Sequence, residues 1–145
     1  MADVSSRVRE NFAQQQFMKT IGASLLSVKE GAVEITVPFR PDLTQQNTFV
    51  HAGVITTVLD SACGYAALTV APDNADVLSV EFKVNLLSPA VGERFVARAK
   101  VKRAGRRITV CVADAFAVTA TEEKLVATML ATIITMNATS NNLSS

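Results

Sequence analysis

The segment from His51 to Val70 constrains the fold of this chain more than any other part of its sequence. Nearly every position is apolar, small or uncharged, and the length suits a helix rather than a strand. A helix that is apolar nearly all round must be enclosed by the rest of the protein. One carboxylate, Asp60, lies in the middle of this helix, and burying an unpaired charge is costly. The chain must therefore wrap around the helix, and it must pair, expose or use Asp60.

The bulk composition narrows the class of protein. The 145 residues suit one domain, and a hydrophobic fraction of 49% is enough for a real core. The formal net charge of +1 gives no indication of a nucleic-acid partner. Cys63 and Cys111 form no Cys-x-x-Cys pattern, which indicates a reducing compartment, and with a single histidine they argue against a structural zinc site.

The sequence also bears on location. No apolar leader follows the charged N-terminus, so we expect a cytoplasmic protein without a signal peptide. The segment 49–71 is long enough to span a bilayer, but it contains Asp60, three threonines and two glycines. Because the rest of the chain alternates like a soluble sheet, we expect no membrane partner.

Around the long helix, roughly 52–70, the sequence predicts one short amphipathic helix over Arg7–Thr20 and six strands. The strands are predicted over 21–29, 32–39, 77–87, 93–103, 107–119 and 124–136. In the third strand, alternation places Val80, Phe82, Val84 and Leu86 on one face and Ser79, Glu81, Lys83 and Asn85 on the other. Strands joined by short turns pair antiparallel. The predicted class is α+β, a curved antiparallel sheet of about six strands wrapped round one central helix, with a single domain over 1–137 and a flexible tail over 138–145.

The start of the long helix carries a specific pattern. Phe49-Val50-His51-Ala52-Gly53, with Asp60 nine residues after His51, resembles the hotdog-fold thioesterases of the phenylacetyl-CoA thioesterase (PaaI-like) type, in the 4-hydroxybenzoyl-CoA thioesterase superfamily. In that family His-Gly-Gly opens the central helix, and an Asp or Glu follows at the same spacing. Segments 80–90 and 103–108 resemble the family's third-strand and hairpin signatures. Ala52 replaces a family glycine, which leaves the backbone N–H group in place.

The resemblance implies an acyl-CoA thioesterase in which a carboxylate works beside a helix N-terminus. Asp60 is implied as a general base for water or as a nucleophile, and the sequence does not choose between these roles. The N–H groups of Ala52 and Gly53 are implied as the oxyanion hole, because free amides and the helix dipole favour negative charge. The remaining implied catalytic residues are His51, which fixes the helix start, Ser79, whose hydroxyl orients water or the carboxylate, and Gln45, for which Gln46 or Asn47 could substitute.

Two further sets of residues are candidates for substrate binding. Thr56, Thr57 and Gly64 lie within one helical turn of Asp60, where they line the acyl pocket or merely allow close helix–sheet packing. The candidates for the nucleotide phosphates of coenzyme A are basic: Lys83, Arg103, Arg106 and Arg107. The acyl group, which could be small, medium-chain or aromatic, stays open, as does the choice between coenzyme A and acyl carrier protein. No metal or organic cofactor is expected.

Helix geometry indicates that one chain alone cannot form a site that uses both His51 and Asp60. His51 and Asp60 are nine residues apart, or about 13 Å along the axis at 1.5 Å per residue, and cannot touch within one chain. The resemblance implies that the carboxylate of one subunit faces the helix start of its partner. We therefore expect a homodimer with composite sites, which the family commonly doubles to a homotetramer.

Other interpretations of the same residues stay open. A hotdog hydratase or dehydratase would use a histidine and an acid at carbon, but here the only histidine comes first on the helix. A non-catalytic protein that binds acyl-CoA or an acyl carrier would keep the fold and lose turnover. Asp60 could also be a structural carboxylate that caps a backbone group or pairs with an arginine.

Overall fold

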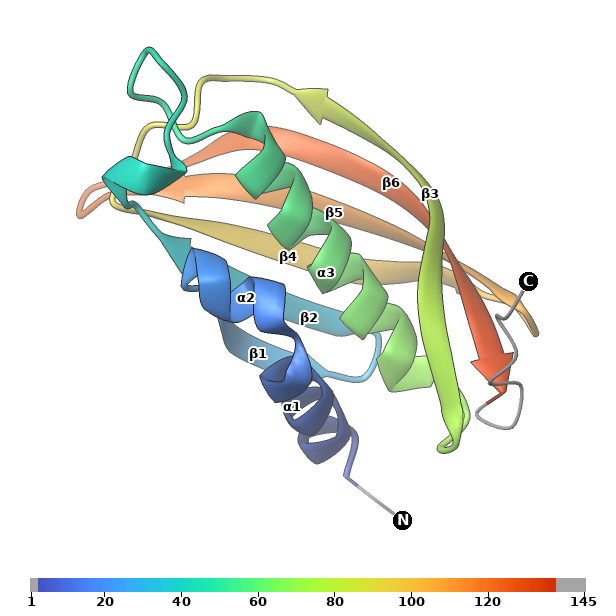
Figure 1. The fold of residues 1–145 in the computed structure, drawn as a ribbon. Coiled ribbons are helices and arrows are strands. Elements are labelled where there is room, and N and C mark those ends of the chain that lie inside the picture. Colours follow the sequence, from blue (N-terminus) through green and yellow to red (C-terminus); the bar gives the residue numbers. More distant parts are fainter. Residues whose placement is uncertain (1–2, 138–145) are drawn as a thin grey trace, which may run out of the picture.

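One antiparallel sheet wraps around one long helix in the computed structural model, which describes residues 3–137 (Figure 1). The sheet order is β1-β2-β4-β5-β6-β3. The elements are α1 (Val4–Gln14), α2 (Gln16–Ile21), β1 (Ser24–Lys29), β2 (Ala32–Pro38), the short 3-10 helix η1 (Pro41–Leu43), α3 (Ala52–Val70), β3 (Ala75–Leu86), β4 (Arg94–Ala104), β5 (Ile108–Val118) and β6 (Glu123–Asn137). The predicted α+β class is confirmed, whereas the predicted tail over 138–145 lies outside the described residues.

The core lies between α3 and the concave face of the sheet, and α1 and α2 lie on the same side (Figure 1). The face of β5 that meets α3 is made of small buried side chains, namely Thr109, Cys111, Ala113, Ala115 and Ala117. Small residues let the helix approach the sheet closely, and the Cys111 thiol lies 3.5 Å from the carbonyl oxygen of Cys63 on α3. Both cysteines are free and fully buried.

Helix α3 is long and apolar enough to cross a membrane by length and composition, and within the described residues it alone is. However, 56% of its apolar window is buried inside the protein. A core helix passes the same test, and enclosure by the sheet accounts for its composition.

The predicted helix over Arg7–Thr20 is wrong as a single element. It is two helices that meet at Gln15, whose backbone is extended with φ −80° and ψ 103°. The Gln15 side chain bonds to the hydroxyl groups of Tyr65 and Ser61 on α3. The break between the two helices therefore coincides with tertiary contacts. No proline or glycine near Gln15 marks it in the sequence.

The predicted alternation of β3 is wrong for Ser79, which was expected on the same face as Glu81 and Lys83. The ladder with β6 slips between Ser79 and Glu81, so a bulge separates the two halves of the strand. Ser79 pairs with the buried Ile133, and after the bulge Phe82, Val84 and Leu86 pair with the buried Ala131, Met129 and Ala127. Residues directly opposite in a ladder share a face. Ser79 therefore lies on the helix-facing side together with Phe82, and not opposite to it.

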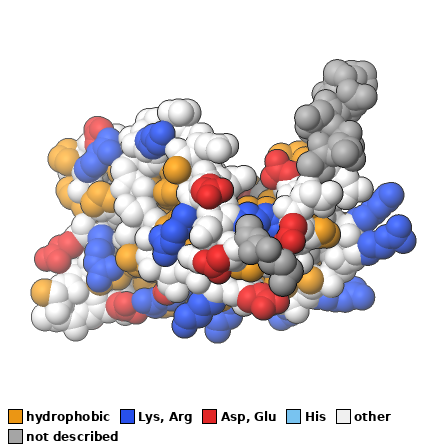
Figure 2. Space-filling model, turned by 90° about the horizontal axis from the view of Figure 1, so that it is seen from below, with side chains coloured by type: hydrophobic (Ala, Val, Ile, Leu, Met, Phe, Trp, Pro, Cys, Tyr) orange, Lys and Arg blue, Asp and Glu red, His pale blue; other side chains and the backbone are white. Residues whose placement is uncertain are grey.

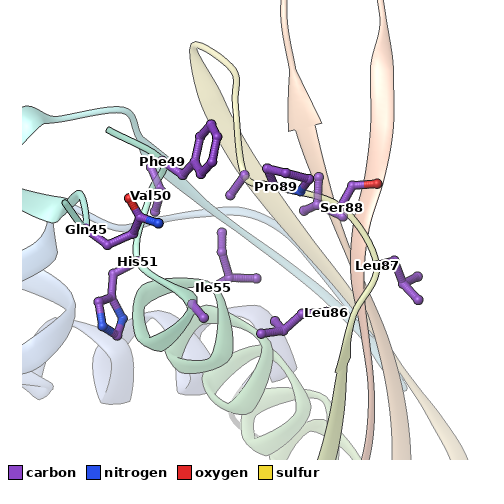
Figure 3. Close-up of a pocket in the computed structure, with 12 residues that line it drawn as sticks. Gln45, Phe49, Val50, His51, Ile55, Leu86, Leu87, Ser88 and Pro89 are labelled. Atoms are coloured by element: carbon purple, nitrogen blue, oxygen red, sulfur yellow. The ribbon is translucent and has the colours of Figure 1, made fainter. Parts of the chain in front are cut away.

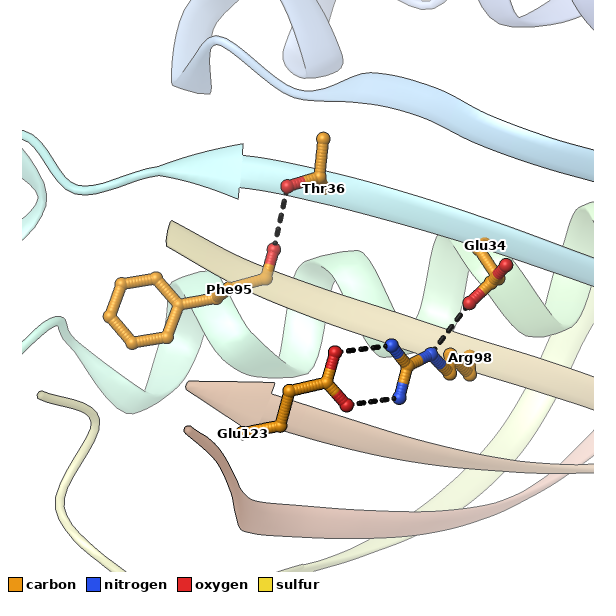
Figure 4. A network of polar contacts seen from close by, with 5 residues as sticks. All are labelled: Glu34, Thr36, Phe95, Arg98 and Glu123. Atoms are coloured by element: carbon orange, nitrogen blue, oxygen red, sulfur yellow. Dashed lines mark hydrogen bonds and ion pairs between the residues drawn. The ribbon is translucent and has the colours of Figure 1, made fainter. Parts of the chain in front are cut away.

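The outer face of the sheet carries ion pairs. The Arg98 guanidinium lies 2.6 Å from a Glu34 carboxylate oxygen and 2.7 Å from one of Glu123 (Figure 4). It also stands over the Phe116 ring. Hydrogen bonding to Arg98 lowers the pKa of Glu123. On the face seen in Figure 2, basic and acidic side chains are interspersed. This distribution agrees with the near-neutral net charge of +1.

Candidate functional site

The carboxylate of Asp60 is paired with a serine rather than an arginine. The Ser79 hydroxyl on β3 donates a hydrogen bond of 2.6 Å to Oδ1 of Asp60 on α3. Both residues are half-buried. The bulge at Val80 turns Ser79 toward the helix, a use of bulges that is frequent near active sites. Asp60 is therefore held in one orientation, and its Oδ2 has no hydrogen-bond partner among residues 3–137.

This pair stands at the wall of an open cavity of about 440 Å³, which we call the carboxylate hollow. Its lining comes from α1, the α1–α2 junction, α3 and β3, and it comprises Asn11, Gln15, Asp60, Ser61, Gly64, Tyr65, Leu68, Asp76, Val77, Leu78 and Ser79. Much of this lining is polar, which distinguishes the hollow from an ordinary packing defect. Asn11 and Gln15 were missed by sequence reasoning, because a run of amides in a surface segment does not show which side chains face inward.

At the helix start, His51 acts as the N-cap of α3. Its Nδ1 accepts a hydrogen bond of 2.8 Å from the Gly53 N–H group. Through this bond His51 fixes the start of the helix, as a positioning residue. The Gly53 amide is thereby engaged, whereas the Ala52 N–H has no hydrogen-bond partner within the described residues 3–137.

Ala52 opens onto a second cavity of about 420 Å³, the helix-start hollow. Figure 3 shows Gln45 and His51 on one side of it and Leu86 and Leu87 on the β3 side. The complete lining is mostly apolar: Gln45, Phe49, Val50, His51, Ala52, Ile55, Leu86, Leu87, Ser88, Pro89, Ala90 and Val126. The side-chain oxygen of Gln45 accepts a hydrogen bond of 2.5 Å from the Asn47 N–H group. Gln45 lines this hollow, whereas Gln46 and Asn47 do not.

The two hollows have no lining residue in common. His51, Ala52 and Gln45 line the helix-start hollow, and Asp60, Ser79 and Gly64 line the carboxylate hollow. The structure therefore separates these predicted catalytic residues into two groups, as the helical spacing requires.

The predicted acyl-pocket residues differ from one another. The hydroxyls of Thr56 and Thr57 donate back to the helix carbonyls of Ala52 and Gly53, and these threonines line neither hollow. Gly64 does line the carboxylate hollow, and a Cβ added there would meet no heavy atom within 4 Å. Close helix–sheet packing is therefore not the reason for this glycine.

The predicted phosphate-binding residues are also separated. Arg103, Arg106 and Arg107 line a third open cavity of about 520 Å³ at the β4–β5 turn, and Lys83 does not. Lys83 lies opposite Leu130 on β6, away from this turn. The turn depends on Gly105, since a Cβ there would lie 2.7 Å from the carbonyl oxygen of Ile108.

The described residues offer no cluster of three or more His, Cys, Asp or Glu side chains that could hold a metal ion. Burial raises the pKa of the Cys63 thiol above the range in which a thiolate nucleophile forms near neutral pH. The chemistry that this arrangement offers is that of a carboxylate, a hydroxyl and helix-terminal amides.

The family model described as the thioesterase superfamily matches residues 47–124. The chain belongs to the thioesterase superfamily. The matched range begins two residues after Gln45 and extends into β6, and it includes both His51 and Asp60. Membership supports hydrolase activity.

Solved structures agree with this assignment. A thioesterase family protein from Silicibacter pomeroyi is 48% identical, with a TM-score of 0.91 over 93% of this chain and 99% of that chain. The PaaI protein of the phenylacetic acid degradation operon of E. coli is 17% identical and shows the same fold, with a TM-score of 0.81 over 93% of this chain and 97% of that chain. The hotdog fold implied by the sequence resemblance is thereby confirmed for this superfamily member.

A sequence relative points to the same chemistry. A protein of Saccharolobus solfataricus that is named as a candidate esterase is 29% identical over 111 residues, which cover 76% of this chain and 79% of the relative. Ester and thioester hydrolysis both need a stabilised oxyanion and an activated nucleophile.

Proposed function

We propose that this protein is an acyl-CoA thioesterase that hydrolyses R–CO–S–CoA to the free acid and coenzyme A. The observation that carries the proposal is the Asp60 carboxylate, oriented by Ser79 at 2.6 Å on the wall of an open cavity. A structural carboxylate would be expected to neutralise a cation or cap a backbone amide, and Asp60 accepts from a hydroxyl instead. Membership in the thioesterase superfamily supports the hydrolytic reading.

In the proposed reaction, the residues of the helix-start hollow and those of the carboxylate hollow act together as one composite site. The thioester carbonyl oxygen accepts a hydrogen bond from the Ala52 N–H group at the positive end of α3. Asp60 takes a proton from water as the water oxygen attacks the carbonyl carbon, or attacks that carbon itself and forms a mixed anhydride that water then cleaves. In either case the C–S bond breaks, and coenzyme A leaves as a thiolate that takes up a proton.

We propose that a second copy of the chain completes each site. β3 is an edge strand of twelve residues. An unpaired edge of this length readily pairs with another chain. The exposed fractions of Val80, Leu86 and Leu87 are 55%, 56% and 52%, so a homodimer would cover a large apolar area here. In such a dimer, Asp60 of one protomer faces the helix start of its partner, and a homotetramer would be a pair of these dimers.

The β4–β5 turn is our candidate for the site that binds the phosphates of coenzyme A. Arg103, Arg106 and Arg107 line one cavity, and guanidinium groups match phosphate oxygens in pairs. The acyl group proposed is small, medium-chain or aromatic. Because Cys63 and Cys111 are both free, we propose a cytoplasmic location.

The first test is release of free thiol from a panel of aliphatic and aromatic acyl-CoAs. Asp60→Asn should lower turnover by about a hundredfold or more, because it removes the base or nucleophile. Asp114→Asn is the matched control, since it changes the same charge on the outer face of the sheet, where Asp114 accepts from Thr128. Thiol release by neither wild type nor control would refute the thioesterase and favour an acyl-CoA binder or a hydratase.

The second test removes a single N–H group. Ala52 is the first residue of α3, where proline is tolerated, and His51 has the extended backbone (φ −59°, ψ 137°) that a following proline requires. Ala52→Pro should keep the fold and lower kcat by about a hundredfold, the loss that one oxyanion donor typically causes. Ala52→Ser, which keeps the N–H group, should keep most of the activity.

Mixing the two defects tests the composite site. Co-expressed Ala52→Pro and Asp60→Asn chains should recover up to about a quarter of wild-type activity, because half the dimers are mixed and each has one intact site. Absence of any recovery, with mixed dimers demonstrated, would show that each site is built within one chain.

A further inference from the structure

The carboxylate hollow extends from Asp60 toward the C-terminal end of α3. Gly64 and Leu68 follow Asp60 at intervals of one helical turn, and all three line the hollow. Eight residues of helix separate Asp60 from Leu68, or about 12 Å at 1.5 Å per residue. The hollow therefore leads away from the reacting carboxylate over a distance that suits an acyl chain.

Gly64 forms an open position along this path. A glycine inside a helix destabilises it by about 1 kcal/mol relative to alanine. Here nothing in the packing compensates for that loss, since a Cβ would meet no heavy atom within 4 Å. The missing side chain instead enlarges the hollow at the point where a bound acyl group would cross α3.

The wall beyond Gly64 is a hydrogen-bonded network. The Tyr65 hydroxyl donates to the Asn11 side-chain oxygen at 3.1 Å and accepts from the Gln15 amide at 3.0 Å. Ser61 donates to the Gln15 side-chain oxygen at 3.1 Å. The amide nitrogen of Asn11 has no hydrogen-bond partner within the described residues, and the Gln15 amide uses one of its two protons. The wall thus offers spare donors from Asn11 on α1 and from Gln15 at the α1–α2 junction to whatever occupies the hollow.

The charge of the wall limits what that occupant can carry. Asp76 lines the same hollow as Asp60, so an anionic acyl terminus would meet like charge. The donors of Asn11 and Gln15 are neutral and suit a hydroxyl or amide oxygen. A purely aliphatic terminus would leave these donors without a partner and would displace their water.

We infer that the acyl group of the thioesterase proposed above lies along α3 over Gly64 and places a neutral hydrogen-bonding group against Asn11 and Gln15. The last turn of α1 and its junction with α2 at Gln15 then set substrate preference, although they contribute nothing to the reacting atoms. This inference rests on the proposed function and names its substrate class, acyl groups with a neutral polar far end.

The test compares matched substrates. The kcat/KM of butanoyl-, hexanoyl- and octanoyl-CoA is measured beside that of their ω-hydroxy and ω-carboxy counterparts. For at least one chain length, the hydroxy substrate should be preferred over the plain one by about tenfold, the factor that one net hydrogen bond supplies. The carboxy substrate should be the poorest of each set.

Two variants connect the preference to the residues. Asn11→Leu combined with Gln15→Leu should reduce the hydroxy preference to less than about twofold. The control Gln14→Leu changes the exposed last residue of α1 between them and should keep the preference. Gly64→Ala should lower kcat/KM for the octanoyl substrates more than for butanoyl-CoA, with an unchanged or higher Tm. Thermal unfolding checks that each variant is folded.

The outcomes separate this inference from the proposed function. Thiol release that depends on Asp60 but shows no hydroxy preference at any chain length would overturn the inference alone. If no substrate is turned over, calorimetry can still test the inference. It would compare the binding of plain and ω-hydroxy acyl-CoAs to wild type and to the variant that combines Asn11→Leu with Gln15→Leu. Equal affinity for plain and hydroxy partners would then overturn it.

Discussion

Arg7 links α1 to the end of the central helix, and its removal gives the sharpest stability prediction. The guanidinium donates to three backbone carbonyls: those of Ala71 at 3.1 Å, Pro72 at 2.8 Å and Ala75 at 2.7 Å. These carbonyls follow α3, whose C-terminal end carries a partial negative charge. One side chain on α1 thus holds the segment that connects α3 to β3.

The magnitude follows from the bond count. A hydrogen bond from a charged donor contributes about 1.5–3 kcal/mol when its partner cannot reach water. The carbonyl of Pro72 is at an exposed contact, and the other two contacts are part-buried, so water recovers some of the loss. We therefore expect Arg7→Met, which keeps the apolar stem, to lower the free energy of unfolding by about 3 kcal/mol.

Urea unfolding followed by circular dichroism measures this loss as a shift of the midpoint. Arg9→Met is the matched control, because Arg9 makes only an exposed bond to Ser5 in the same helix and should cost less than about 0.5 kcal/mol. If Arg7→Met loses no more than Arg9→Met, the three-carbonyl contact does not stabilise the protein and the reasoning fails.

Three further predictions concern the core, the site and a turn. Burial raises the pKa of the Cys63 thiol well above its usual range, and it raises the pKa of the Cys111 thiol to about 11. Both thiols should therefore resist iodoacetamide at pH 8 until the protein unfolds. Because the thiols ionise at a lower pH in the unfolded chain, the free energy of unfolding should be constant below about pH 8.5. Above that pH it should fall by up to about 1.4 kcal/mol per pH unit per thiol. Urea unfolding at each pH should show a smaller fall for a double Cys→Ala variant. Ser79→Ala should lower kcat by about ten- to a hundredfold with little change in KM, and Ser79→Thr should recover part of the loss, as steady-state kinetics would show. Gly105→Ala should lower the Tm, because its Cβ would collide with a backbone carbonyl oxygen, whereas Gly64→Ala should not.

Much of the fold could be predicted because the apolar pattern is unambiguous. The central helix was expected over roughly 52–70 and lies at Ala52–Val70, since an all-round apolar segment admits only an enclosed helix. The six strands lie within a few residues of their predicted ranges, because alternation and short turns mark them clearly.

The failures have a common physical cause in contacts between distant segments. A slipped ladder register moved Ser79 to the other face of β3, and register is decided by the partner strand, not by the strand itself. The break at Gln15 coincides with its bonds to α3, fifty residues away for Tyr65. The separation of His51 from Asp60 could be predicted, by contrast, because the helical rise alone determines it.

The single extra residue in β3 changes the spacing along the strand at which the hydroxyl of the site is found. A deletion of Val80 would make the ladder with β6 regular, with Ser79 still opposite Ile133 and Glu81 still opposite Thr132. The hydroxyl would therefore stay on the side of Asp60, because residues directly opposite in a ladder share a face. In a related chain that lacks this extra residue, the hydroxyl would lie two residues before the position of Phe82, and not three.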